Sequence, residues 1–214
     1  MTSIYKDGQR IERGDCLLRI KGRAAAILTA ERTALNFVQR LSGIATVTRQ
    51  YVDRISHTKA KLLDTRKTTP GWRALEKYAV ACGGGTNHRV GLYDQVMIKD
   101  NHLAALDGDI HNAVALAREA SPKLKIEVEA DTLEQVQAAA EAGAGIVLLD
   151  NMSCEQIRAA IELIDGRSET EASGGVTLET VREIAGTGVN FISVGALTHS
   201  APSVDIALDF DQIA

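Results

Sequence analysis

Three clusters of basic side chains lie between residues 64 and 102, each where an apolar run meets a polar or glycine-rich turn. The clusters are Arg66 with Lys67, His88 with Arg89, and Lys99 with His102. Loops that leave a rigid scaffold are the usual places for binding sites. A solvated surface position is the simpler interpretation for any one of these side chains. Their repeated position favours a pocket for a ligand with several negative charges.

Acidic and glycine residues follow other apolar runs. Glu129 and Asp150 end consecutive predicted strands, and paired carboxylates in a cationic site commonly hold Mg²⁺. General acid–base catalysis and plain hydrogen bonding are the alternative interpretations of this pair. The Ser173–Gly175 turn leads into a predicted helix, and Gly195 follows the last predicted strand. Both turns therefore favour a phosphate bound by backbone N–H groups.

The combination points to a phosphorylated substrate, a divalent cation and a second anionic group. Arginine pairs with a carboxylate through two parallel hydrogen bonds, so Arg66 and Arg89, together with His88, suggest a di- or polyacid. Neither a Ser–His–Asp nor a Cys–His arrangement is evident in the sequence. Catalysis by positioning and charge stabilisation is therefore expected.

Strand-like and helix-like stretches alternate from residue 57 onward. The predicted strands are residues 61–64, 96–99, 125–130, 145–150, 170–173 and 190–195. The predicted helices are residues 72–82, 110–120, 133–142, 154–163 and 178–185. Most of the strands are continuous apolar runs, as is typical of parallel strands buried on both faces.

This alternation predicts either a TIM-like α/β barrel or a doubly wound sheet. The first strand is not followed by a GxGxxG motif, which favours the barrel. In a barrel, functional residues lie at the carboxyl ends of the strands. The cations, acids and glycines described above stand at those ends.

The first part of the chain has a different character. Residues 1–28 suggest short strands separated by turns, which cannot be stable alone. Thr29 is predicted to cap a long helix, with Ser42-Gly43 as a bend or a break. Arg32 would lie in the first turn of that helix, where a cation is unfavourable next to the helix dipole. It is either a surface residue or a contact for an anion.

Composition limits the class of protein. The chain of 214 residues has 45% hydrophobic residues and a net charge of -4, which argue for one good core and against a nucleic-acid binder. Its three widely spaced cysteines argue against a disulfide framework or a zinc site and for a reducing compartment. No apolar run approaches the ~18 residues of a membrane span, and no signal peptide opens the chain. A cytoplasmic protein without membrane contact is expected.

Six strings of the sequence resemble those of quinolinate phosphoribosyltransferases, the carboxylating nicotinate-nucleotide pyrophosphorylases. They are ERTALNFVQRLSGIAT, DTRKTTPGWRALEKYAVACGGGTNHRVGLYDQVMIKDNH, EVEA, LLDN, ASGGV and ISVGALTHS. The similarity runs from about Gly14 to the end of the chain. It implies transfer of phosphoribose from phosphoribosyl pyrophosphate to quinolinate with loss of the 2-carboxylate. The products would be nicotinate mononucleotide, pyrophosphate and CO₂, on the de novo route to NAD.

The resemblance also implies how the diacid is held. Arg66, His88 and Arg89 match the positions that bind the quinolinate carboxylates. Arg32 matches an arginine that family members insert into the site of a neighbouring subunit, which implies a homodimer or a higher oligomer.

The catalytic set follows from the same resemblance. Lys67 and Lys99 match lysines that face the substrate and phosphoribosyl pyrophosphate. Glu129 and Asp150 match the acidic pair near the ribose hydroxyls and Mg²⁺. The residues that match the phosphate loops are Ser173, Gly174 and Gly195.

Members of this family carry an N-terminal α/β sandwich domain, which this chain enters near its last strands. The expected division is a remnant of that domain in residues 1–28, an incomplete barrel in residues 29–200, and a tail in residues 201–214 that returns to the N-terminal domain. Two alternatives stay open. One is a related phosphoribosyltransferase, either the molybdenum-transport-associated paralogue or a nicotinate-specific enzyme, although the full carboxylate clamp favours the diacid. The other is a non-catalytic truncated remnant.

Overall fold

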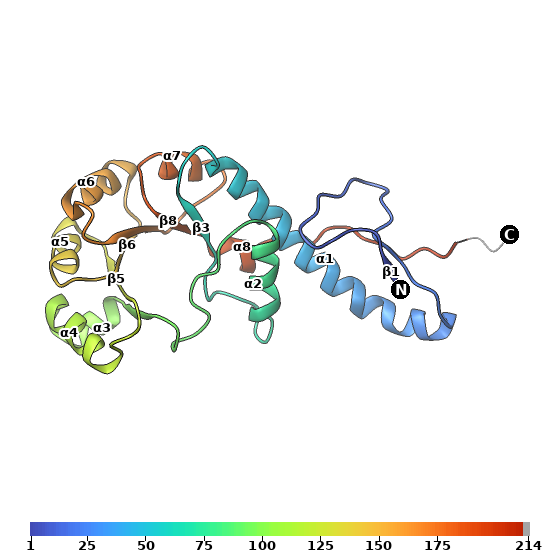
Figure 1. Ribbon diagram of the computed structural model, residues 1–214, viewed down its shortest axis with the longest axis horizontal. Helices are drawn as coiled ribbons and strands as arrows, with labels where there is room; N and C mark the ends of the chain where they lie inside the picture. Colours follow the sequence, from blue (N-terminus) through green and yellow to red (C-terminus); the bar gives the residue numbers. More distant parts are fainter. Residues whose placement is uncertain (212–214) are drawn as a thin grey trace.

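The computed structural model describes residues 1–211 of the chain. Its largest part is a curved sheet of six parallel strands with helices on the outer face (Figure 1). The strands are β3 (Lys61–Leu63), β4 (Val96–Ile98), β5 (Ile126–Ala130), β6 (Ile146–Asp150), β7 (Glu169–Ser173) and β8 (Phe191–Ser193). The helices after β3 are α2 (Arg73–Cys82), α3 (Asp100–Ala104), α4 (Ile110–Ala120), α5 (Leu133–Glu141), α6 (Cys154–Ile164), α7 (Val181–Ala185) and α8 (Ala196–His199).

The strand order identifies the sheet as a barrel. In a doubly wound sheet the order reverses at a switch point. Here β4 to β8 are neighbours in sequence order, and β3 joins the sheet beside β8. At the open edge of the described chain, Thr86 makes a single parallel bridge to Leu63 of β3, and β3 and β4 are not paired. The prediction of an incomplete TIM-like barrel is confirmed.

The predicted strands and helices are all present, most of them within two residues of the expected ends. Helix α7 differs more, because it begins at Val181 rather than residue 178. Thr177 N–H donates to Thr180 Oγ1 at 3.0 Å, and this side-chain turn occupies the residues before the helix. The short helices α3 and α8 were not predicted, since five and four residues carry too little periodicity.

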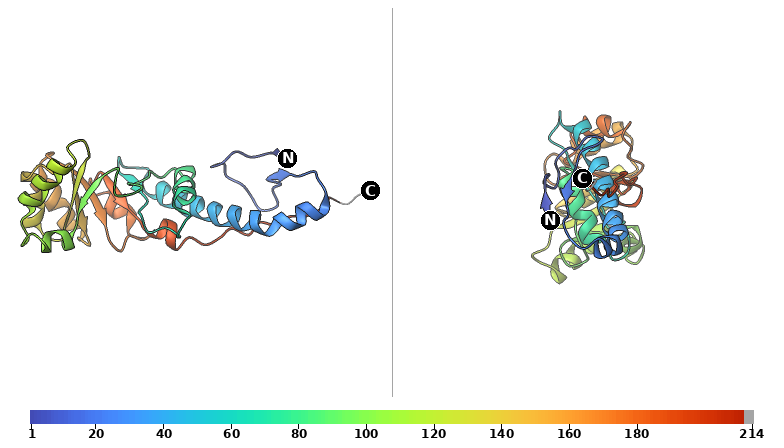
Figure 2. Two further views of the ribbon diagram at one scale, coloured as in Figure 1. Left: turned by 90° about the horizontal axis from the view of Figure 1, so that it is seen from below. Right: turned by 90° about the vertical axis from the view of Figure 1, so that its right-hand side faces the viewer.

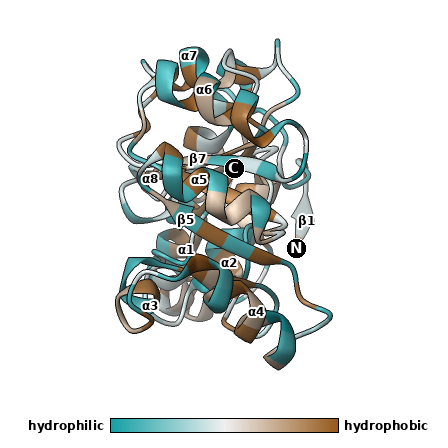
Figure 3. Cartoon of the chain, turned by 90° about the vertical axis from the view of Figure 1, so that its left-hand side faces the viewer, coloured by the Kyte–Doolittle hydropathy of each residue, from teal (hydrophilic) through white to brown (hydrophobic). Residues whose placement is uncertain are grey.

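Side chains on each strand alternate between the helix-covered face and the barrel interior. On β5, Ile126, Val128 and Ala130 are buried in the layer between sheet and helices. Glu127 and Glu129 occupy the other face, and Figure 3 shows this alternation of apolar and polar residues along β5. The barrel interior therefore carries charged groups, while the hydrophobic core lies outside the sheet.

Helix α1 (Ala24–Ile55) is one continuous helix of 32 residues. The prediction that Thr29 caps it was wrong: Arg23 stands at the N-cap, and Thr29 Oγ1 donates to the Ala25 carbonyl within the helix at 2.8 Å. Arg32 is consequently about two turns into the helix rather than in its first turn. Ser42 and Gly43 do not interrupt α1. A Cβ at Gly43 would lie 1.9 Å from the Pro202 carbonyl oxygen, so glycine is needed for a close chain approach.

The two ends of the described chain lie along α1, whose first half extends away from the barrel (Figure 2). Strands β1 (Thr2–Ser3) and β2 (Leu18–Arg19) form an antiparallel pair. Residues 201–211 return beside α1, where Gln39 Nε2 donates to the Ile206 carbonyl at 2.7 Å. The tail was predicted as residues 201–214, and residues 212–214 lie outside the described residues. The division into 1–28, 29–200 and 201–214 stays a prediction. No described helix is both long and apolar enough to cross a membrane.

Candidate active site

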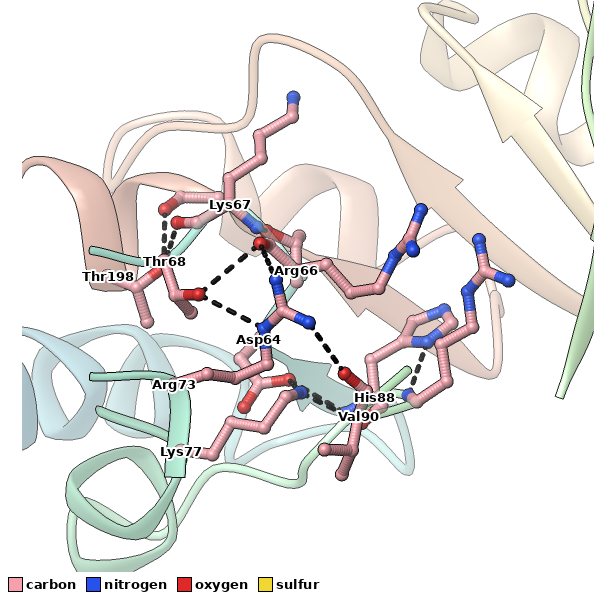
Figure 4. A network of polar contacts seen from close by, with 12 residues as sticks. Asp64, Arg66, Lys67, Thr68, Arg73, Lys77, His88, Val90 and Thr198 are labelled. Atoms are coloured by element: carbon pink, nitrogen blue, oxygen red, sulfur yellow. Dashed lines mark hydrogen bonds and ion pairs between the residues drawn. The ribbon is translucent and has the colours of Figure 1, made fainter. Parts of the chain in front are cut away.

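A buried ion pair fixes the loop that follows β3. Asp64 Oδ1 accepts hydrogen bonds from Lys77 Nζ of α2 at 2.5 Å and from the His88 N–H at 2.8 Å. Lys77 also donates to the His88 carbonyl at 2.8 Å. Burial raises the pKa of Asp64, and the Lys77 ammonium opposes that shift. The end of β3, helix α2 and the segment with His88 are thus tied together (Figure 4).

Arg73 of α2 joins the two loops that carry the first two basic clusters. Its Nη1 donates to the Val90 carbonyl at 2.9 Å, and its Nη2 donates to the Arg66 carbonyl at 3.2 Å. Its Nε donates to Thr68 Oγ1 at 3.1 Å. All three nitrogens of the Arg73 guanidinium take part in these hydrogen bonds. The Arg66 side chain extends away from this network (Figure 4).

The residues after Arg66 are held from two more directions. Thr198 of α8 donates to the Lys67 carbonyl at 2.8 Å. Glu76 of α2 is fully buried and accepts from the Thr69 N–H at 3.1 Å and from the Thr69 hydroxyl at 2.8 Å. The backbone of this loop is therefore rigid, and the Lys67 side chain projects from it (Figure 4).

Arg66 and Arg89 form the cationic part of the site. Arg89 is 8% exposed and donates to the Gln95 carbonyl at 3.2 Å, with Nη2 3.4 Å from Met97 Sδ. Burial lowers the pKa of Arg89, and the nearby Arg66 charge lowers it further. Two guanidinium groups held close together are stabilised by an anion between them, so this pair favours a carboxylate ligand.

The His88 ring turns toward two buried acids. Its Nε2 lies 3.3 Å from Glu127 Oε2 and 3.3 Å from Glu171 Oε2, and its Nδ1 accepts from the Arg89 N–H at 2.7 Å. Burial lowers the pKa of His88, but the two carboxylates outweigh this and raise it to about 9. The backbone N–H of Arg89, which faces Nδ1, favours the neutral ring. The carboxylates of Glu127 and Glu171 have the larger effect, so the charged ring is favoured at neutral pH.

The third cluster lies at the ends of β4 and β5. Lys99 Nζ forms an ion pair with Glu129 Oε2, and both side chains are partly exposed. The His102 ring accepts from the Lys99 N–H at 3.0 Å, which turns the chain into α3. Asp150, at the end of β6, accepts from the Asn151 amide at 2.6 Å.

A cavity of about 460 Å³ opens where β6, β7 and β8 end. The site residues predicted from the sequence that line it are Lys67, Asp150, Ser173, Gly174 and Gly195. Gly174 has φ +92°, and a Cβ there would lie 2.1 Å from Asn151 Oδ1. A Cβ at Gly195 would approach Lys67 Cδ and His199 Nε2 to 3.2 Å. Position 174 therefore requires glycine, and a Cβ at Gly195 would press on the Lys67 and His199 side chains that line the cavity.

Not every predicted site residue lies at the carboxyl ends of the strands. Arg32 is exposed and belongs to the first half of α1. That half of the helix extends away from the barrel (Figures 1 and 2). The residues that sequence reasoning did not single out as site residues are Arg73, Gln95, Glu127, Glu171 and His199. A signal for Glu127 and Glu171 was present, because each stands at an interior-facing alternate position of its strand.

A parallel α/β barrel whose strand ends carry a cationic pair, a lysine–glutamate pair and a glycine-lined cavity is an anion-binding barrel of the kind that handles phosphorylated substrates. The C-terminal domain of quinolinate phosphoribosyl transferase, as a family model, matches residues 44–209, and the N-terminal domain matches residues 1–42. The chain belongs to the quinolinate phosphoribosyltransferase family. The family and the enzyme class expected from the sequence are confirmed.

Individual relatives agree with this assignment. A Bacillus subtilis (strain 168) protein named "Probable nicotinate-nucleotide pyrophosphorylase (carboxylating)" is 51% identical over 95% of this chain and 71% of its own length. The nicotinate-nucleotide pyrophosphorylase (carboxylating) of Mycobacterium leprae is 50% identical over 95% of this chain and 72% of its own. The crystal structure of the Ehrlichia chaffeensis nicotinate-nucleotide pyrophosphorylase has a TM-score of 0.93 and 43% identity, and covers 97% of this chain and 75% of its own. The chain is thus shorter than these relatives.

Proposed function

We propose that the chain transfers the phosphoribosyl group of phosphoribosyl pyrophosphate to quinolinate, with loss of CO₂ and pyrophosphate. The observation that carries this proposal is the placement of Lys67. Its loop neighbour Arg66 belongs to the cationic pair, while its own side chain lines the glycine-bounded cavity. A diacid bound at the arginine pair and a sugar phosphate bound in the cavity would then lie next to each other at the carboxyl ends of the strands.

The acid half of the substrate complex fits the arginine pair. Quinolinate carries two adjacent carboxylates, and Arg66 and Arg89 offer two planar forks of N–H donors. His88, with its charge favoured by Glu127 and Glu171, adds positive potential beside them. A monoacid such as nicotinate leaves part of this charge unpaired, which favours the diacid over a nicotinate-specific enzyme.

The phosphate half fits the cavity at Ser173, Gly174 and Gly195. The two glycines leave room for a phosphate beside the backbone, and His199 and Lys67 add positive or hydrogen-bonding groups at its wall. These residues support the phosphate loops expected from the sequence.

The donor set at the mouth also fits Mg²⁺. Glu129 and Asp150 present carboxylate oxygens at a partly exposed mouth, and a hard cation takes few protein oxygens together with water and phosphate oxygens. Glu129 and Asp150 would hold the ion. When bound, Mg²⁺ supplies charge neutralisation for the pyrophosphate group. Activity should be lost with excess EDTA and regained on adding MgCl₂; full activity in EDTA would remove the ion from the proposal.

The catalytic contribution of the chain is charge placed beside the reacting atoms. The ribosyl centre becomes cationic as its bond to pyrophosphate breaks, and the carboxylates of Glu129 and Asp150 stabilise it. Loss of CO₂ leaves an electron pair on the pyridine ring, which the ammonium groups of Lys67 and Lys99 stabilise until a proton from water takes it. None of the residues named for the site has to act as a general acid or base.

A homodimer, or a higher oligomer, is part of the same proposal. Leu28 and Val38 lie on the extended half of α1 with 55% and 39% of their surface exposed, and Ile20 precedes them with 47% exposed. Apolar surface of this kind suits a second copy of the chain. Arg32 on the same half of the helix would then reach the site of the other subunit. The cytoplasmic location stays a prediction.

The experiment is an assay of the full chain with quinolinate, phosphoribosyl pyrophosphate and Mg²⁺, with nicotinate mononucleotide as the measured product. Product formation from quinolinate but not from nicotinate supports the proposal. Turnover of nicotinate alone would favour the nicotinate-specific alternative. Binding of quinolinate without any product would favour a non-catalytic remnant.

A further inference from the structure

Two buried carboxylates in the barrel interior contact neither substrate in the reaction proposed above. Glu127 on β5 and Glu171 on β7 are 0% and 1% exposed. Strand β6 separates β5 from β7, so the two side chains approach each other across the barrel interior. Among the described residues, Glu127 Oε1 and both Glu171 oxygens have no hydrogen-bond partner. Burying such groups is unfavourable, so their presence in the interior needs a physical reason.

Glu127 is the centre of a closed circuit of contacts that includes both His88 and Arg89. Glu127 Oε2 accepts from Gln95 Nε2 at 2.7 Å and lies 3.3 Å from His88 Nε2. Arg89 Nη1 donates to the Gln95 carbonyl at 3.2 Å, and the Arg89 N–H donates to His88 Nδ1 at 2.7 Å. One carboxylate oxygen therefore faces the His88 ring directly and is linked to the Arg89 guanidinium through Gln95, whose side chain it binds and whose carbonyl the guanidinium binds.

Glu171 contacts the same ring from the opposite strand. Its Oε2 is 3.3 Å from His88 Nε2, the same distance as that from Glu127. The ring nitrogen is thus held between two carboxylates, which restrains rotation of the ring about its bond to Cβ. A single carboxylate would leave that rotation less restricted.

A metal ion is the other occupant that this geometry allows. Ligand atoms of His88, Glu127 and Glu171 all lie within 4.8 Å of one another. A metal on Nε2 requires Nδ1 to carry the proton. It also requires Nε2 without a proton, whereas the charged ring favoured by Glu127 and Glu171 carries a proton on Nε2, which faces the two carboxylates at 3.3 Å.

We propose that Glu127 and Glu171 are positioning residues for the diacid clamp, which hold the His88 ring and the Arg89 guanidinium in the geometry that a dicarboxylate needs. The identity of the ligand rests on the proposed function; the positioning role rests on the contact circuit. The two acids do not touch the substrate in this account.

A role through charge and a role through positioning predict opposite changes in the affinity for quinolinate when Glu127 or Glu171 is replaced by a neutral residue. Loss of a negative charge beside the clamp strengthens the attraction for any anion. Loss of positioning weakens the binding of a dicarboxylate, because its two carboxylates need the His88 ring and the Arg89 guanidinium to be correctly placed at the same time. It affects the binding of a monocarboxylate less. The sign of the change in affinity therefore decides between the two roles.

The test is calorimetric titration of the full chain with quinolinate and with nicotinate. The variants are Glu127→Gln, which keeps the shape of the side chain, Glu127→Ala and Glu171→Gln. The matched control is Glu169→Gln, on the same strand as Glu171 but in an exposed pair with Lys125. We expect quinolinate to bind about tenfold more weakly or worse in the three variants, from loss of a charge-assisted contact. Nicotinate binding should change much less, and the control should match the wild type.

Three results would overturn the proposal. The first is unchanged or tighter quinolinate binding in the Glu127→Gln and Glu171→Gln variants. The second is an equal loss in Glu169→Gln. The third is stoichiometric binding of Zn²⁺ to the wild type that is lost in the Glu127 variants, which would make the cluster a metal site.

A second readout separates this proposal from the proposed function. Nitrogen NMR of the histidine rings, with His88→Gln to assign the signal, should show a changed His88 ring signal in Glu127→Gln and an unchanged one in Glu169→Gln. If the wild type bound no quinolinate, the proposed function would fail while this spectrum still tested the contact circuit. An identical His88 signal in the wild type and Glu127→Gln would overturn the positioning role.

Discussion

Lys77 Nζ lies 2.5 Å from Asp64 Oδ1, and the two side chains are 3% and 0% exposed. This buried ion pair lies directly beneath the loops that carry the basic clusters, because Asp64 also accepts the His88 N–H. This charge pair at the end of β3 therefore contributes to the orientation of the site, together with the Arg73, Thr198 and Glu76 contacts. Loss of either partner would leave the other buried without an opposite charge.

Replacement of Lys77 by methionine should lower the free energy of unfolding by about 3–5 kcal/mol, because the Asp64 carboxylate stays buried and unpaired. Urea denaturation measures this change. The control is Lys125→Met, which removes an exposed pair with Glu169 and should change stability by about 1 kcal/mol or less. Equal losses in the two variants would contradict the account of the Asp64 pair.

Replacement of Arg89 by alanine should raise the KM for quinolinate by about 100-fold, because a buried guanidinium that pairs with a carboxylate of the substrate is removed. The KM for phosphoribosyl pyrophosphate should stay within about twofold, since the phosphate cavity is elsewhere. Steady-state kinetics with each substrate varied in turn measures both. Arg182→Ala, on the exposed side of α7, is the control. A loss confined to phosphoribosyl pyrophosphate would remove Arg89 from the acid half.

Replacement of Gly174 by alanine should raise the KM for phosphoribosyl pyrophosphate. The new Cβ would lie 2.1 Å from Asn151 Oδ1, so the cavity wall must shift. Gly108→Ala is a matched control, because Gly108 has a similar φ of +81° but open space around it. Both variants should lose about 1 kcal/mol of stability from backbone strain, but only Gly174→Ala should change the kinetics. Equal KM values for phosphoribosyl pyrophosphate in the two variants would show that the turn at Gly174 does not contribute to phosphate binding.

His88 should make stability depend on pH. Its pKa rises from 6.5 unfolded to about 9 folded, so its contribution is fully present below pH 6.5 and is lost as pH rises through about 9. The free energy of unfolding should therefore fall by about 3 kcal/mol between pH 6 and pH 9.5 in the wild type, and much less in His88→Gln. Urea denaturation at the two pH values tests this. Parallel pH profiles for the two proteins would show that His88 is not the group that titrates.

The scaffold could be predicted from sequence because its signals are local. Apolar runs such as Ile146–Leu149 predict buried parallel strands, and capping residues such as Ser153 mark the helix starts. The start of α1 was misjudged because Arg23 gives no side-chain cap signal and Thr29 offers a false one. Propensity alone does not separate the two positions.

The site could be predicted only in part, for the same physical reason. Lys99, Asp150 and Gly195 stand at the carboxyl ends of strands, where the functional residues of barrels lie, and such ends can be located in the sequence. Glu127 and Glu171 lie within strands that are two apart in the sheet, so their shared contact with His88 depends on how the sheet closes. The supporting role of Arg73 likewise depends on the distance between two loops, which no spacing in the sequence gives.

In the proposed reaction, the arginine pair and the glycine-lined cavity act on one substrate complex. The most direct test uses quinolinate with an isotope label in its 2-carboxylate and measures labelled CO₂ released by the full chain with Mg²⁺. We expect release of labelled CO₂ only when phosphoribosyl pyrophosphate is present, with one pyrophosphate formed for each CO₂. Release without phosphoribosyl pyrophosphate, or pyrophosphate formation without CO₂, would contradict the proposed reaction.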